Sequence, residues 1–120
     1  MRIGEIIESN TTMFVAGTYE LHAAPPFGAL VRAEGRDTCA AYGLVYNIST
    51  TSREMSGRAL VRGRDGMYDA DIYLENPDLE AVLQTEFQAL IIGFCDGPNI
   101  RQHLPSYPPP THYSVHLCDD

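Results

Sequence analysis

The chain contains no lysine, and this absence excludes several classes of function. All eight basic residues are arginine, against 16 acidic residues, so the net charge is −8. Without lysine there is no Walker-A phosphate loop, no Schiff-base chemistry and no lysine-rich nucleic-acid patch. The acidic excess repels phosphate backbones, so unaided binding to DNA or RNA is not expected. The only local basic group is Arg58, Arg62 and Arg64.

Cysteine and long apolar runs are also scarce. The three cysteines, Cys39, Cys95 and Cys118, have neither CxxC spacing nor the number typical of a disulfide framework. No apolar run reaches the length of a membrane span, and the first ten residues do not resemble a signal peptide. We therefore expect a cytoplasmic protein with reduced thiols and no membrane insertion.

The length of 120 residues and the turn-rich composition predict one domain, residues 1–120, that is mainly β. Ten glycines and eight prolines separate short runs of β-type residues. In the first half the pattern predicts four strands, approximately at Ile3–Glu8, Thr12–Ala16, Ala29–Ala33 and Thr38–Ile48. A polar bend at residues 9–12, a Pro25-Pro26 loop and a hairpin turn at Glu34–Asp37 connect them.

The second half is less regular. Ser49–Gly66 predicts a mobile loop with a short strand near Ala59–Val61. The alternation of Tyr68, Ala70, Ile72 and Leu74 with polar residues predicts a half-buried strand. One short helix should follow, with Asn76 as N-cap and Pro77 in its first position. The last predicted strands are Gln88–Phe94 and His112–Cys118, joined by a stiff proline-rich segment.

Several motifs in this order resemble one known family. They are Ile3-Gly4-Glu5 to Val15, Pro25-Pro26-Phe27-Gly28, Tyr42-Gly43-Leu44, Ala89 to Phe94, and Pro108-Pro109-Pro110 to Val115. Together they resemble the HAS-barrel, the small β-barrel shared by HerA-type DNA translocases and rotary ATP synthase subunits. The motif positions that carry the resemblance are Gly4, Thr11, Thr12, Pro26, Gly28, Gly43, Gly93 and Pro109.

The resemblance covers nearly the whole chain and implies a closed or partly open barrel of about six to seven strands. In the family the barrel precedes an ATPase domain, whereas none follows here, and residues 76–84 insert a helix before the penultimate strand. Family barrels pack side by side into rings and dock partner proteins. The resemblance thus implies a homo-oligomer or a protein partner.

A metal site is the strongest candidate for chemistry. His112, His116 and Cys118 would share one face of an extended segment, and with His103 they could supply nitrogen and sulfur ligands. The spacing typical of zinc sites is missing, so ordinary side chains of a terminal strand are the favoured interpretation, and no cofactor is expected.

The other candidates have simpler explanations. Asp65, Asp69 and Asp71 resemble part of a calcium loop, but the twelfth position is Asn76 rather than a glutamate. Scattered acids such as Glu5 suit an outer surface. Seven tyrosines could stack on bases, but without clustered positive charge they favour a core or a protein interface. No GxSxG sequence occurs, and we expect no catalysis.

The sequence therefore predicts a non-catalytic assembly or partner-binding module, for example an accessory to a separately encoded ATPase or translocase. Two alternatives stay open. One is a nucleic-acid-binding accessory that uses the Arg58–Arg64 loop, and the other is a barrel that binds a small molecule or a metal.

Overall fold

The computed structural model describes residues 1–36, 39–53 and 57–118. Within these residues the chain forms seven strands and two short helices, so the prediction of a mainly β fold is confirmed. Two helices replace the single one that we predicted. In chain order the elements are β1 (Arg2–Ser9), β2 (Met13–Thr18), β3 (Leu30–Ala33), β4 (Ala41–Ser52), α1 (Ala70–Glu75), α2 (Leu79–Val82), β5 (Leu83–Asp96), β6 (Asn99–Arg101) and β7 (Ser114–Leu117).

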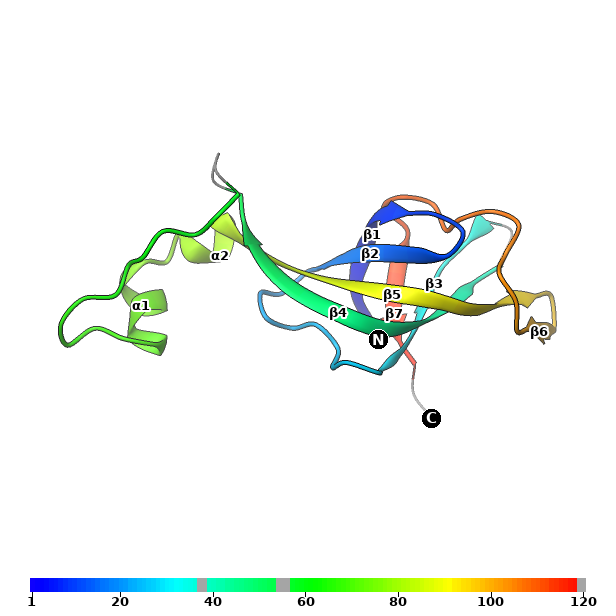
Figure 1. The fold of residues 1–120 in the computed structure, drawn as a ribbon, viewed down its shortest axis with the longest axis horizontal. Helices are drawn as coiled ribbons and strands as arrows, with labels where there is room; N and C mark the ends of the chain where they lie inside the picture. Colours follow the sequence, from blue (N-terminus) through cyan, green and yellow to red (C-terminus); the bar gives the residue numbers. More distant parts are fainter. Residues whose placement is uncertain (37–38, 54–56, 119–120) are drawn as a thin grey trace.

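All seven strands belong to one antiparallel sheet that curls into a ring (Figure 1). The strand order is β2-β1-β7-β3-β4-β5-β6, and an additional pairing of β2 with β5 closes six of the strands on themselves. Among the described residues, the short β6 pairs with the end of β5 and with no other strand. Closure leaves β6 and the far ends of β4 and β5 outside the ring.

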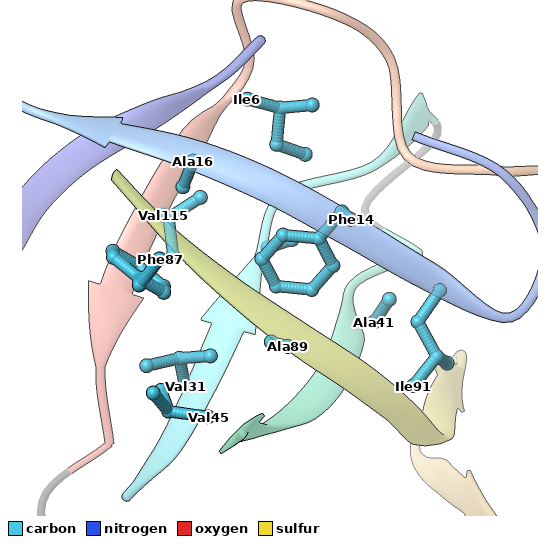
Figure 2. Close-up of a cluster of buried hydrophobic side chains, with 11 residues drawn as sticks. Ile6, Phe14, Ala16, Val31, Ala41, Val45, Phe87, Ala89, Ile91 and Val115 are labelled. Atoms are coloured by element: carbon cyan, nitrogen blue, oxygen red, sulfur yellow. The ribbon is translucent and has the colours of Figure 1, made fainter. Parts of the chain in front are cut away.

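The core lies inside this ring and is built from alternate residues of its strands (Figure 2). Such alternation is what a strand with one buried face requires. Its largest fully buried side chains come from six strands, one from each: Ile6, Phe14, Val31, Val45, Phe87 and Val115. These side chains fill the ring, as expected for a sheet closed around so few strands.

The turn between β1 and β2 forms where the polar residues predicted it. The Asn10 side-chain oxygen accepts hydrogen bonds from the backbone N–H of Thr12 at 2.8 Å and of Met13 at 3.0 Å. This is the local backbone mimicry that makes asparagine favourable in tight turns.

Gly43 lies at a close approach between β4 and the packed interior. A Cβ at this position would lie 2.9 Å from the Ala89 Cβ and 3.1 Å from the Phe14 ring. Only a residue without a side chain lets β4 pass this close to the packed interior.

The predicted strand over Tyr68–Glu75 is wrong, because Ala70–Glu75 of this segment forms α1. None of the α1 residues is buried. A strand needs a paired neighbour, and β4 and β5 instead pair with each other as far as Ser52 and Leu83. Without a partner strand, the helix-favouring Ala70, Leu74 and Glu75 decide the local structure.

The predicted helix start at Asn76 is also wrong. Asn76 ends α1 instead, since its backbone N–H and its side-chain amide both donate to the Ile72 carbonyl, at 3.0 and 2.8 Å. The second helix, α2, begins only at Leu79 and has four residues.

The predicted loop at Ser49–Gly66 is shorter than expected, because β4 continues to Ser52. Ala59–Val61 forms no strand. Residues 54–56 lie outside the described residues, as do Asp37 and Thr38, which we had placed in the hairpin turn and at the start of the fourth strand.

Residues 57–82, which we call the arm, carry α1 and α2 away from the ring at the end of the β4–β5 ribbon (Figure 1). The molecule is accordingly elongated, with extents of 57 × 31 × 19 Å. Across the described residues, no helix has the length and apolar character needed to cross a membrane.

Candidate interaction surface

An apolar row crosses the outer face of the sheet. Leu30 of β3 is paired with Leu44 of β4, which is paired with Leu90 of β5, and Leu90 is paired with Met13 of β2. Directly paired residues of an antiparallel sheet point to the same face. The four side chains therefore form a line across four neighbouring strands.

The row points away from the core. The next residues along the same strands, Val31, Val45, Ala89 and Phe14, are the buried ones. Because side chains alternate between faces, the row must face outward.

The row is accessible to a partner. Leu30 is 41% exposed, Leu44 38% and Leu90 48%. Ile92, two residues beyond Leu90 on the same strand, is 43% exposed and extends the row. Single exposed apolar residues are ordinary, but residues aligned over adjacent strands form a continuous patch of the kind that marks interaction sites.

Sequence reasoning missed this row because it depends on strand register. Leu30, Leu44 and Leu90 are far apart in the sequence, and only the pairing brings them together. A shift of one residue in any strand would turn its side chain into the core. The β-type run of each strand was visible in the sequence, whereas the alignment between strands was not.

The structure does not bring the candidate metal ligands together. β7 begins only at Ser114, so His112 lies before the strand, at a backbone φ of 71°, and shares no strand face with His116. The His112 side chain is hydrogen-bonded to Glu5, while the His116 Nε2 lies 3.6 Å from a Glu34 oxygen.

The other two candidate ligands lie elsewhere. The His103 ring packs edge-to-face on Phe94, with 5.1 Å between ring centroids, and the Cys118 backbone N–H donates to Leu30. Among the described residues, no group of three or more His, Cys, Asp or Glu side chains could hold a metal ion.

The arginines of the Arg58–Arg64 loop lie on the arm, and two of them are engaged with acids. Arg62 donates to Asp78 at 3.0 Å, and Arg64 lies 3.9 Å from a Glu75 oxygen. These pairs reduce the positive charge that the loop could offer to a phosphate backbone. The geometry therefore gives the nucleic-acid alternative little support.

A cleft of about 770 Å³ lies at the end of the ring where β1 ends and β4 begins. The proline-rich segment 105–111 forms one wall, and Phe94 and Ala41 contribute to the other. Ser9 donates a hydrogen bond of 2.6 Å to the Pro109 carbonyl, which fastens the segment across the end of β1. We had predicted this segment only as a stiff connection.

The remaining positions that carry the HAS-barrel resemblance either shape turns and close contacts or have no contact that assigns them a role. Gly28 has a φ of 84°, and the Pro26 carbonyl accepts a hydrogen bond from Ala29, so both shape the turn before β3. Gly93 lies close to β6, where an added Cβ would be 2.6 Å from the Arg101 carbonyl oxygen. Thr11 lies exposed in the β1–β2 turn.

No protein-family model matches the chain, and no curated protein sequence matches it either. The HAS-barrel resemblance therefore depends on the motif residues alone and stays a prediction.

Proposed function

We propose that this chain is a non-catalytic interaction module that binds a protein partner, a second copy of itself or another protein, through the apolar row. The observation that carries the proposal is the register of Leu30, Leu44 and Leu90, which aligns exposed leucines across three strands. Removing such a patch from water on association is favourable by about 25 cal/mol per Å² of apolar surface.

The motif resemblance supports the finer parts of this proposal. Barrels of the HAS type assemble beside ATPase domains, so a separately encoded ATPase or translocase in the cytoplasm is the partner class that we propose. The acidic net charge of −8 favours a protein surface over a nucleic acid.

The test compares Leu90→Asp with a matched control, Leu104→Asp. Leu90 is 48% exposed and Leu104 is 46% exposed, but Leu104 lies in the loop after β6, outside the row. Light scattering coupled to size-exclusion chromatography gives the mass of each variant over a range of concentrations. In parallel, each variant serves as bait in an extract of the protein's own cells.

We expect Leu90→Asp to lose a specific association, either with itself or with a captured protein, that Leu104→Asp retains. An unpaired carboxylate in an apolar contact is costly, whereas the same change elsewhere on the surface is tolerated. If wild type is monomeric and captures nothing that Leu90→Asp fails to capture, the proposed function is wrong.

A further inference from the structure

Three basic side chains meet on the sheet although they are distant in the sequence. Arg2 of β1 is paired with His116 of β7, and His116 is paired in turn with Arg32 of β3. Directly paired residues of an antiparallel sheet point to the same face. We call Arg2, His116 and Arg32 the basic triplet.

The basic triplet points away from the core. The residues on either side of Arg32 and the residue before His116 are fully buried inside the ring, and Figure 2 shows two of them there: Val31, Ala33 and Val115. Because side chains alternate between the two faces of a strand, Arg32 and His116 face outward. The register of β1 shifts between Arg2 and Gly4, and this irregularity brings Arg2 to the same face as His116.

The local charge of the basic triplet is positive. Among the described residues, Glu34 is the only acid within ion-pair distance of it, with one oxygen 3.5 Å from the Arg32 Nε and 3.6 Å from the His116 Nε2. Arg2 forms no ion pair with a described residue. With the histidine counted as neutral, two arginines and one glutamate leave a charge of +1, in a chain whose net charge is −8.

Glu34 does not satisfy the Arg32 guanidinium. The Arg32 Nε is buried and has no hydrogen-bond partner among the described residues, since 3.5 Å is too long for a good N–H···O bond. No described residue accepts a hydrogen bond from the two terminal nitrogens, and 43% of the side chain is exposed. A guanidinium is permanently charged and has five N–H donors, so Arg32 can donate to a further anionic acceptor.

The spacing of the basic triplet suits one small oxyanion. Side chains of directly paired residues begin about 5 Å apart, so the two arginines begin about 10 Å apart with His116 between them. Both arginines are long enough to reach over the middle strand. Arginine donates parallel N–H bonds to phosphate and carboxylate oxygens. A tetrahedral phosphate group, with a charge of about −1.5 to −2, can accept from all three side chains, whereas a planar carboxylate has only two oxygens.

The acidity of the remaining chain limits the size of the ligand. At physiological ionic strength, charges more than about 8 Å away are largely screened, so a small anion interacts mainly with the basic triplet itself. A nucleic acid would extend beyond the triplet over a chain with an acidic excess. We propose that the basic triplet binds the phosphate group of a small molecule. This inference goes beyond the proposed function and does not involve the apolar row.

The experiment titrates inorganic phosphate into the full chain at constant ionic strength and follows the His116 backbone amide by NMR. We expect saturable binding, and we expect Arg32→Gln to weaken it about tenfold or more, because hydrogen bonds from a charged donor are lost. Arg2→Gln should weaken it in the same way. Arg2 is exposed, so this variant tests the site even if Arg32→Gln fails to fold.

Arg101→Gln is the matched control. Arg101 is 50% exposed and its Nε lies 3.5 Å from an Asp96 oxygen, so it resembles Arg32 in exposure and in its ion pair. It lies on β6, outside the basic triplet, and its loss should leave phosphate binding unchanged. Glu34→Gln removes the carboxylate that competes with the ligand and should tighten binding about threefold. Damage to the fold would not produce such a gain.

Further probes define the ligand. Adenosine monophosphate that binds more tightly than methyl phosphate, and still depends on Arg32, supports a nucleotide as the source of the phosphate group. Equal binding of the two supports recognition of the phosphate group alone. Acetate that binds as tightly as inorganic phosphate overturns the assignment to phosphate. The inference is also wrong if inorganic phosphate does not bind, or if Arg101→Gln weakens its binding as much as Arg32→Gln and Arg2→Gln do.

Discussion

Gly4 lies at a close approach of β1 and β2, and replacing it with alanine should destabilise the ring. A Cβ at Gly4 would collide with the Gly17 carbonyl oxygen, and it would lie 3.0 Å from the Gly17 carbonyl carbon and 3.2 Å from the Thr18 Cα. All three atoms belong to the backbone of the paired strand, so no rotamer change can relieve the contact. The two strands must separate locally.

Forcing extra atoms into a packed region costs about 1–3 kcal/mol, and a rigid backbone contact belongs at the upper end. Alanine recovers about 0.4–1 kcal/mol by restricting the unfolded chain. We therefore expect Gly4→Ala to lower the free energy of unfolding by about 2 kcal/mol. With a urea m-value of about 1–3 kcal/mol/M, the unfolding midpoint falls by roughly 1 M.

Gly63→Ala is the matched control for this measurement. The nearest atom to a Cβ at Gly63 is the Ile72 methyl carbon at 3.6 Å, an ordinary van der Waals distance. Its unfolding midpoint should equal or slightly exceed that of wild type. A Gly4→Ala midpoint equal to wild type would refute the close approach of β1 and β2 at this residue.

Three further substitutions test the closed sheet. Phe87→Ala removes a phenyl group that is 1% exposed and should lower the free energy of unfolding by about 3–5 kcal/mol in urea titrations. A loss below about 1 kcal/mol contradicts the assigned core. Asn10→Ala removes the hydrogen bonds that hold the β1–β2 turn and should cost about 1 kcal/mol in the same assay, whereas Asn10→Asp should retain most of it. Gly93→Ala places a Cβ 2.6 Å from the Arg101 carbonyl oxygen and should speed amide hydrogen exchange in β6; unchanged β6 exchange would count against this contact.

The strands of the ring could be predicted because their residues serve the chain's own core. Phe14, Val31, Val45 and Ala89 lie in short runs of β-type residues bounded by glycine, proline and polar turn residues, and such runs mark strands directly. Turn residues such as Asn10 fixed where the strands end. Runs of β-type residues and turn residues can be recognised in the sequence without knowledge of the fold.

The apolar row and the cleft could not be predicted from the sequence, because both depend on contacts between segments that are distant in the chain. The row requires the register of β3, β4 and β5, and the cleft requires that the proline segment cross the end of β1. No local pattern encodes either arrangement. The candidate metal ligands are separated for a related reason, since a left-handed backbone at His112 interrupts the extended segment on which they would have shared a face.

The arm misled the sequence interpretation in an informative way. Tyr68, Ile72 and Leu74 have the apolar alternation of buried residues, yet Tyr68 is 56% exposed and Leu74 79%. These residues have the sequence pattern of a buried face, yet their own chain does not bury them. A surface that a partner covers would show this combination. If that is its cause, association should protect the arm.

Hydrogen exchange at increasing protein concentration tests this explanation. Exchange through local opening slows wherever a contact stabilises the closed state. We expect amides of residues 57–75 to exchange more slowly as association proceeds, with Val61→Asp abolishing the effect. Buried amides of β2 and β5 serve as the internal reference, since the ring already protects them at every concentration. Arm exchange that does not change while wild type associates would show that its apolar residues lie outside the contact.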